Sequence, residues 1–377
     1  MSGRGLMRSL RLPAVGLVLA LAAICGSARA ATLDASLGQA RASVGAPAAT
    51  ATVMSCGRVL WSGASGVYAT GSRRSVTPST RFILASATKT VTAPMIMQQV
   101  QAGRLSLTTR LSAFYPQLAN AGQITLRMLL NHTSGLADYF NNPRINSIIN
   151  NQPRHRWTRQ QIIAAIGRPQ FRPGARYKYT NTNYVVLGGI LEQVTGRSIE
   201  SNFQRAVARP AGMQQSTFTY RPARSSWLPH PYDQNNDGSL TDNWVPGLGI
   251  SSDYWGPVWT DGGLASTSTD LARFGQALFA GRLINRKTLA QMTVMGPFDY
   301  GLGIFDQRFD GRRWLGHDGD YGGFESENWT DPARHLTLAV TTDLTEADSA
   351  PDTTSDRIWR ALVAAYDRTA ATSPTCS

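Results

Sequence analysis

The chain has 377 residues, of which 42% are hydrophobic and 16% charged, and this balance excludes a largely disordered protein. Lys and Arg outnumber Asp and Glu by 37 to 24, which gives a formal net charge of +13. The arginines are scattered along the chain, so we expect a solvated basic surface and no nucleic-acid partner, with attraction to an anionic cell envelope as the lesser alternative. The length exceeds what one compact core usually takes, so we expect two lobes.

Residues 1–30 have the pattern of a secretory signal peptide. Three arginines precede an apolar run and a small-residue cleavage motif: Arg4, Arg8 and Arg11, then 12–24, then 28–30. Cleavage before Ala31 would export the protein to the bacterial periplasm or the outside and lower the net charge to +9. Lipidation at Cys25 is the lesser alternative, because Ile24 stands where a small residue is expected. We expect no transmembrane anchor after signal removal, since no second apolar run could span a bilayer.

Two cysteines remain after signal removal, Cys56 and Cys376. In an oxidising compartment they could form a disulfide between the first strand region and the C-terminal tail, which we favour over a pair of free thiols.

The first third of the chain alternates between helix and strand signals. Spaced leucines predict a helix over 31–44, ended by Gly45 and Pro47, and alternating residues over 52–68 predict hairpin strands. A further helix is expected from Ser86 to Gln101. Residues 105–261 have helical periodicity between Gly and Pro breaks, with helices expected over 125–131, 158–166, 183–195 and 199–208, and a long loop over 231–254.

The last third returns to a mixed pattern. We expect helices over 269–279, 287–292 and 356–366, and strands over 300–305, 313–316, 323–327 and 336–342. The whole pattern predicts an α/β (α+β) fold: an antiparallel sheet flanked by N- and C-terminal helices, with an inserted helical lobe. Residues 31–377 would form a single domain, with a sheet lobe of 31–104 and 262–377 and a helical lobe of 105–261.

Ser86 and Lys89 are the first pair of residues with chemical meaning. On a helix beginning at Ser86, the lysine lies one turn on and on the same face, within reach of the serine hydroxyl. A neutral amine there could take the serine proton as the hydroxyl attacks a carbonyl group. Taken alone the spacing is weak, because it also fits a solvated helix face. Lysine is nevertheless rare in this chain, which contains only Lys89, Lys178 and Lys287.

Two further motifs follow at long intervals. Tyr179-Thr180-Asn181 precedes a predicted helix, where a tyrosine beside a cation could be drawn toward the phenolate and an amide could hold a substrate carbonyl. Asn183 we interpret as a helix cap. His317-Asp318-Gly319-Asp320 lies between two predicted strands, where the glycine would let a backbone N–H approach an oxyanion. Each motif alone also fits a cap or a turn.

Taken together, the three motifs resemble the serine β-lactamase and D-alanyl-D-alanine carboxypeptidase family, in the branch of class C β-lactamases, DD-peptidases, D-aminopeptidases and esterases. The resemblance runs from about residue 50 to 345. It includes the "LLxHTSGL" segment at 129–136, and the segments 184–192, 210–213 and 262–267. It implies the β-lactamase/transpeptidase-like fold and an enzyme that needs no cofactor and no metal.

The resemblance also implies a role for each motif residue. Ser86 would be the acylated nucleophile, Lys89 its proton acceptor, and Tyr179 a proton shuttle to the leaving group. Asn181 would orient the acyl-side amide of the substrate. The backbone N–H groups of Ser86 and of Asp320, after Gly319, would form the oxyanion hole. From its chemistry alone, His317 could support the tyrosine or the substrate electrostatically.

The third motif departs from the family pattern, which has Lys-Thr-Gly or His-Thr-Gly where this chain has His317-Asp318-Gly319. The family threonine contacts a substrate carboxylate, which Asp318 would repel, and Asp320 adds a second acid. We therefore favour neutral or cationic substrates such as amides, esters and amino-terminal D-residues. The alternative is that both acids face solvent or an arginine such as Arg312 or Arg313.

These observations predict an exported, monomeric serine hydrolase acting on a small molecule or a cell-wall peptide. The alternatives are a D-alanyl-D-alanine carboxypeptidase or β-lactamase, and a non-catalytic penicillin-binding or wall-binding protein. Asp233–Asp237 has part of the spacing of a calcium loop, but Trp244 stands at the twelfth position, so a polar turn is favoured.

Overall fold

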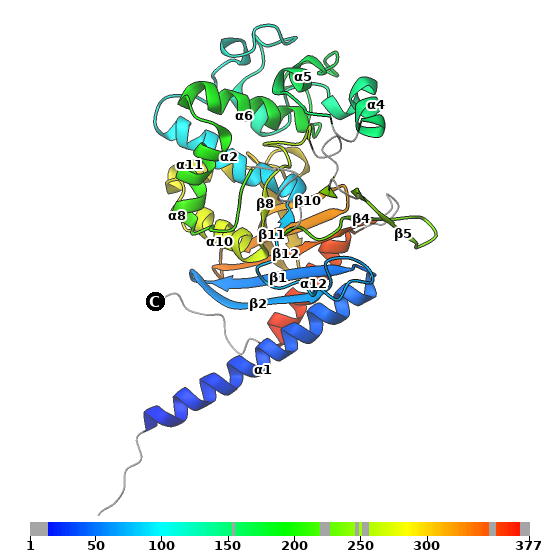
Figure 1. Ribbon diagram of the computed structural model, residues 1–377. Coiled ribbons are helices and arrows are strands. Elements are labelled where there is room, and N and C mark those ends of the chain that lie inside the picture. The colour runs from blue at the N-terminus through cyan, green and yellow to red at the C-terminus, as the bar shows by residue number, and fades with distance from the viewer. Residues whose placement is uncertain are drawn as a thin grey trace, which may run out of the picture.

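The computed structural model describes residues 14–152, 155–218, 227–245, 249–250, 256–346 and 352–369 (Figure 1). A six-stranded antiparallel sheet organises it, in the order β2-β1-β12-β11-β10-β9. The strands are β1 (Ala48–Ser55), β2 (Arg58–Gly66), β9 (Phe305–Phe309), β10 (Arg312–Tyr321), β11 (Phe324–Asp331) and β12 (Leu336–Thr342). Because β1 pairs with β12, with Ala49 opposite Thr342, the two ends of the chain complete one sheet.

Helices cover both faces of this sheet, so β1, β11 and β12 are buried along their whole length. On one face lie α1 (Ala14–Ser43) and α12 (Thr354–Thr369), as Figure 1 shows. Trp359 of α12 packs there against the rings of Trp314 and Trp329, at 4.9 and 6.4 Å between centroids. Leu33 and Leu37 of α1 are buried in the same core.

The opposite face carries α10 (Ser268–Phe279) and α2 (Thr88–Gln101), and beyond them the helical part of the molecule (Figure 1). Its helices are α3 (Leu126–Leu130), α4 (Pro143–Asn151), α5 (Arg159–Ala164), α6 (Asn181–Thr195), α7 (Ile199–Phe203), α8 (Arg209–Ala211) and α11 (Arg286–Met292). Thr125, Thr158 and Ser198 cap α3, α5 and α7, because each hydroxyl accepts a backbone N–H of the first turn. Residues 181–191 of α6 are almost entirely buried, which places its N-terminus inside the protein.

Short strands connect these layers. They are β3 (Phe82–Ile83) with β8 (Ala265–Ser266), β4 (Tyr232–Gln234) between β5 (Leu240–Asp242) and β13 (Leu344–Thr345), and β6 (Trp244–Val245) with β7 (Gly249–Ile250). The β3–β8 pair matters most for the site, because it leads directly into the short turn that contains Ser86.

The predicted α/β fold class is confirmed, and the strand over 336–342 has the predicted bounds. The strand expected over 300–305 is wrong. Gly303 has a φ of +80° and the Gly301 N–H donates to the Ile304 carbonyl, so this segment is a tight turn and β9 begins at Phe305. The loop expected over 231–254 contains the short strands β4 to β7. Of the helix expected over 199–208, Ile199–Phe203 is α-helical and Gln204–Ala208 is a π-helical turn.

Only some of the predictions about the two chain ends fall on described residues. Helix α1 begins at Ala14 and not at Ala31, and Leu33 and Leu37 in its second half pack on the sheet. Cys56 is disulfide-bonded, but Cys376 lies outside the described residues, so its pairing with Cys56 stays a prediction, as do the lobe limits. Within the part of the chain that the structure describes, no helix has both the length and the apolar character needed to cross a membrane.

Replacing Trp359 with Ala should remove the central ring of the α12 core. Loss of a buried Trp typically costs about 3–5 kcal/mol of unfolding free energy, because a cavity remains. Urea denaturation followed by circular dichroism measures this cost. Val59→Ala, at a position that is 42% exposed on β2, is the control and should cost under about 0.5 kcal/mol. Equal stability of the two variants would contradict this account of the core.

Candidate active site

Ser86 lies in a single 3₁₀ turn, Ala85–Ala87, between β3 and α2, and not in the first turn of an α-helix as predicted. Ala85 has a φ of +44°, a left-handed conformation that an alanine adopts only under local constraint. Part of that constraint is the Ser326 hydroxyl on β11, which donates to the Leu84 carbonyl at 2.7 Å. The turn therefore presents the half-buried Ser86 at a fixed place above the sheet.

Lys89 is completely buried one turn after Ser86. Its Nζ lies 3.0 Å from Ser86 Oγ, 2.7 Å from Asn181 Oδ1 and 2.8 Å from the Asp261 carbonyl oxygen. Burial lowers the pKa of Lys89 from 10.5 to about 8, although the charges of Asp261, Asp138 and Asp318 act in the opposite direction. A neutral Lys89 can give its two N–H groups to Asn181 and Asp261, which leaves its lone pair facing Ser86.

Asn181 begins α6 and is held from two sides. Asp138 Oδ2 accepts hydrogen bonds from the Asn181 backbone N–H at 2.7 Å and from Asn181 Nδ2 at 3.0 Å. Asn181 Oδ1 accepts from Lys89. This network fixes which way the amide points and leaves one side-chain N–H for another acceptor.

Tyr179 lies over Lys89, with Nζ 4.8 Å from the ring centroid. Burial raises the pKa of Tyr179 well above its usual value of 10, and the Ser86 hydroxyl offsets this only in part. The buried Tyr179 hydroxyl forms no well-directed hydrogen bond to a described residue. The expectation that a neighbouring cation would draw this tyrosine toward the phenolate is therefore wrong in direction, because desolvation dominates and the negative charge of Asp318 raises the pKa further.

His132, from the 129–136 segment, holds the Tyr179 segment in place. Its Nδ1 accepts from the Thr180 backbone N–H at 3.2 Å and from Asn183 Nδ2 at 3.3 Å, and its ring lies 4.3 Å from that of Tyr179. Burial lowers the pKa of His132 well below 6.5, so the ring is neutral and its proton is on Nε2. The cap predicted for Asn183 is also wrong, because its buried amide contacts His132 and Ser134.

The third motif lies on β10, directly beside the Ser86 turn. A Cβ atom on Gly319 would be 2.1 Å from the Leu84 carbonyl oxygen and 2.9 Å from the Ala87 nitrogen. Only glycine therefore lets the strand approach this closely. Strand β9 pairs with β10 only over 312–316, so the pairing of these two strands ends before the third motif.

His317 and Asp318 form a contact of their own. The His317 Nδ1 lies 2.6 Å from the Asp318 carbonyl oxygen and 3.3 Å from its Oδ1, while Nε2 lies 3.4 Å from the Tyr300 hydroxyl. Burial acts to raise the pKa of Asp318, but His317 outweighs it and the pKa is lowered overall. Asp318 is therefore ionised, with a side chain that is 47% exposed.

The alternative that the two acids face solvent or an arginine is confirmed for solvent, since the Asp318 side chain is 47% exposed and Asp320 is exposed. The two arginines named for it have other partners. Arg312 pairs with Asp310 and Asp367, and Arg313 pairs with Asp306. Asp320 is exposed and accepts from the Thr345 hydroxyl at 3.2 Å.

The structure thus brings together the side chains of Ser86, Lys89, Tyr179 and Asn181, with His317, Asp318 and Gly319 beside them. Sequence reasoning missed Asp138 and Asp261. Asp261 immediately precedes the 262–267 segment, and its buried carboxylate accepts from the Tyr139 hydroxyl at 2.8 Å and the Trp259 backbone N–H at 2.8 Å. Burial raises the pKa of Asp261, with Lys89 opposing the change.

Two other features lie apart from this cluster. A cavity of about 660 Å³ is lined by Tyr115, Leu118, Arg159, Ile163 and Gln193 among others, and by none of the motif residues. Asp233 and Asp237 accept from Asn243 and Ser239 within the β4–β5 hairpin. In the described ranges no group of three or more His, Cys, Asp or Glu side chains is arranged to hold a metal ion.

Comparison with known proteins agrees with this architecture. The sequence profile of the β-lactamase family matches residues 33–364. A D-aminopeptidase of Cereibacter sphaeroides is 26% identical over 303 residues, which are 78% of this chain and 56% of that protein. Penicillin-binding protein 4* of Bacillus subtilis is 26% identical over 72% of this chain and 62% of its own. The crystal structure of a D-stereospecific amidohydrolase from Streptomyces sp. superposes with a TM-score of 0.70 at 26% identity, covering 84% of this chain and 94% of that one.

The fold is therefore that of the β-lactamase/transpeptidase-like enzymes, a mixed α/β architecture with an antiparallel sheet. The chain belongs to the β-lactamase family of serine hydrolases. It spans 56% of the D-aminopeptidase and 62% of the penicillin-binding protein, but 94% of the amidohydrolase chain.

The lowered pKa of Lys89 predicts how the reactivity of Ser86 depends on pH. Below about pH 8 the amine is mostly protonated and cannot accept the serine proton, so the labelling rate should rise through about pH 8 and then level off. The rate of fluorophosphonate labelling between about pH 6 and pH 10 measures this. A flat profile, or the same profile in Lys89→Met, would contradict it.

Gly319→Ala should separate β10 from the Ser86 turn, because the new methyl group overlaps the Leu84 carbonyl oxygen. We expect the labelling rate to fall by about 100-fold or more, since even a displacement of about 1 Å disturbs reacting geometry on that scale. The control is Gly122→Ala, where a Cβ atom meets no described heavy atom within 4 Å. Full reactivity of Gly319→Ala would show that the close approach is unnecessary.

Proposed function

We propose that this protein is an exported serine hydrolase that forms an acyl-enzyme at Ser86 and hydrolyses an amide or an ester. Its substrates would be D-amino-acid peptides or amides, or carboxylic esters. The observation that carries the proposal is the contact of 3.0 Å between Ser86 Oγ and a buried Lys89 whose pKa is about 8. An amine with a pKa near 8 is partly unprotonated near neutral pH, and in that form it is basic enough to take the proton of a serine.

In the proposed acylation step, Lys89 accepts the Ser86 proton as Oγ bonds to the substrate carbonyl carbon. The bond to the leaving amine or alcohol then breaks. Tyr179, kept neutral by burial, relays the proton to the leaving group, and Asn181 offers its remaining N–H to the acyl-side amide. Water then attacks the acyl carbon and passes a proton through Tyr179 to Lys89. The bond to Ser86 Oγ breaks, and Lys89 returns the proton to Oγ, which releases the acid and regenerates Ser86.

The oxyanion would be bound by the backbone N–H groups of Ser86 and Asp320. The close approach of β10 at Gly319 to the Ser86 turn supports this assignment, because it brings the 319–320 backbone beside Ser86. No cofactor enters any of these steps.

The ionised Asp318 favours amides and esters over substrates that end in a carboxylate. A D-aminopeptidase and a D-stereospecific amidohydrolase are among the similar proteins, which supports D-amino-acid derivatives. The second candidate is a D-alanyl-D-alanine carboxypeptidase or a class C-like β-lactamase, which the similar penicillin-binding protein favours. A non-catalytic wall-binding protein would need a silent Ser86, and the Lys89 contact argues against that.

Export by the 1–30 segment, release into the periplasm or the outside, and a monomeric state complete the proposal. Cleavage before Ala31 would leave the part of α1 that contains the buried Leu33 and Leu37, so the sheet would keep its cover.

Intact-mass spectrometry of the mature protein tests the acyl-enzyme. With a fluorophosphonate, the wild type should gain one phosphonyl group on Ser86 and Ser86→Ala should gain none. D-phenylalanine amide and p-nitrophenyl butyrate should be hydrolysed by the wild type alone. Hydrolysis of benzylpenicillin at a comparable rate would favour the second candidate, and inertness toward all four reagents would leave the non-catalytic reading.

A further inference from the structure

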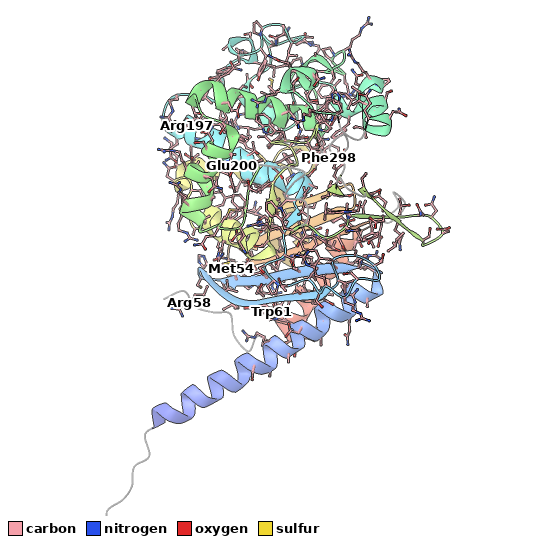
Figure 2. The ribbon with its side chains drawn as sticks, viewed as in Figure 1. Met54, Arg58, Trp61, Arg197, Glu200 and Phe298 are labelled. Carbon is pink, nitrogen blue, oxygen red and sulfur yellow. The ribbon has the colours of Figure 1, made fainter. Side chains whose placement is uncertain are left out.

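Beside the Ser86 cluster lies a group of side chains that the proposed chemistry does not use: Asp318, Tyr177 and Phe298. Phe298 belongs to the 3₁₀ turn Pro297–Asp299, which follows α11 and precedes the turn before β9. In Figure 2 Phe298 lies on the side of the central sheet that carries α2, whereas Trp61 lies on the side of α1.

Phe298 is held in an unfavourable conformation. Its side chain is 73% exposed and its φ is +61°, and the next residue, Asp299, has a φ of +52°. A bulky residue rarely adopts a positive φ, and an exposed apolar ring gains little from folding. Strain of this kind is found at binding sites, where the presented side chain contacts a ligand.

The ring of Phe298 is part of a stack that leads to Tyr179. Phe298 and Tyr177 have centroids 5.0 Å apart at an angle of 31°. Tyr177 lies 6.0 Å from His132, whose ring is 4.3 Å from that of Tyr179. The exposed ring is therefore connected to the Ser86 cluster through two intervening rings.

Asp318 is linked to the same rings. The rings of Tyr177 and Tyr300 are 5.9 Å apart, and that of Tyr300 is 5.8 Å from His317. His317 Nδ1 lies 3.3 Å from Asp318 Oδ1.

Burial raises the pKa of Tyr177 and of Tyr179, and the negative charge of Asp318 raises both further, while it also opposes the lowering of the pKa of Lys89. The carboxylate is thus close enough to act on the half-buried Tyr177 and on the buried Lys89. It is 47% exposed and contacts His317 through one oxygen, so it can accept further hydrogen bonds.

We propose that Asp318, Tyr177 and Phe298 form a subsite for a cationic amino group carried by the substrate. The carboxylate accepts its N–H groups in charge-assisted hydrogen bonds, and the two rings cover the cation and the carbon atoms attached to it. The inference rests on the proposed function and goes further, because it selects cationic substrates among the possible amides and esters. A carboxylate at this position would be repelled.

Three substrates test the subsite. D-phenylalanine p-nitroanilide carries a cation on the acyl side, butyrylthiocholine carries one on the leaving-group side, and p-nitrophenyl butyrate is neutral. Asp318→Asn should lower kcat/KM on at least one cationic substrate by about tenfold or more relative to its effect on the neutral ester. Asp310→Asn removes an exposed acid at the β9–β10 turn, where Asn tolerates the φ of +50°, and should change none of the three.

Phe298→Ala tests the aromatic part of the subsite. It should lower kcat/KM by about threefold or more on the same cationic substrate, mainly through KM. Val294→Ala, at a position that is 66% exposed and precedes the same turn, is the matched control.

Two results would overturn the subsite while leaving the proposed function intact. One is turnover of the neutral ester with neither cationic substrate cleaved. The other is a loss in Asp318→Asn that is equal on all three substrates. A wild type that cleaves none of them and does not label at Ser86 would overturn the proposed function, and the subsite with it.

Discussion

The structure depends on one buried amine. Lys89 has no exposed surface, and leaving such a group without partners in the protein interior would cost several kcal/mol. Three oxygen partners surround its Nζ, on the Ser86 turn, at the start of α6 and on the segment before β8. Because each partner belongs to a different part of the chain, satisfying Lys89 requires those parts to meet. The same burial lowers its pKa, so the constraint that assembles the site also prepares Lys89 for its proposed role as a base.

Two nearby carboxylates limit how far burial lowers the pKa of Lys89. Asp138 holds Asn181, and Asp261 is itself held by Tyr139 and the Trp259 backbone, so both carboxylates lie near Lys89 without pairing directly with it. A direct ion pair would stabilise the protonated amine and remove its basicity. Without direct pairing, the two negative charges only partly oppose the lowering of the Lys89 pKa by burial, which leaves that pKa at about 8. On the other side, the close approach at Gly319 holds β10 against the turn that contains Ser86, the proposed nucleophile.

Much of this could be predicted from the sequence, and the rest could not for physical reasons. The spacing of Ser86 and Lys89 is local, so one helical turn was enough to place them together, and the family resemblance added Tyr179, Asn181 and the 317–320 strand. The contacts of Asp138 and Asp261 depend on how α6 and the segment before β8 pack, and no local pattern encodes that. The direction of the Tyr179 pKa also escaped prediction, because the neighbouring cation is visible in the motif whereas desolvation exists only in the folded protein. The strand expected over 300–305 failed because Gly301 and Gly303 allow a turn inside an apolar pattern.

The state of Lys89 is the central claim, and nuclear magnetic resonance can measure it directly. The chain has only three lysines, so a protein labelled with ¹³C at lysine Cε gives few signals, and the one lost in Lys89→Arg identifies Lys89. The account predicts that this signal titrates with a midpoint of about 8. A midpoint at the ordinary value of 10.5 would contradict it, because the amine would then be protonated throughout the neutral range and could not accept the Ser86 proton.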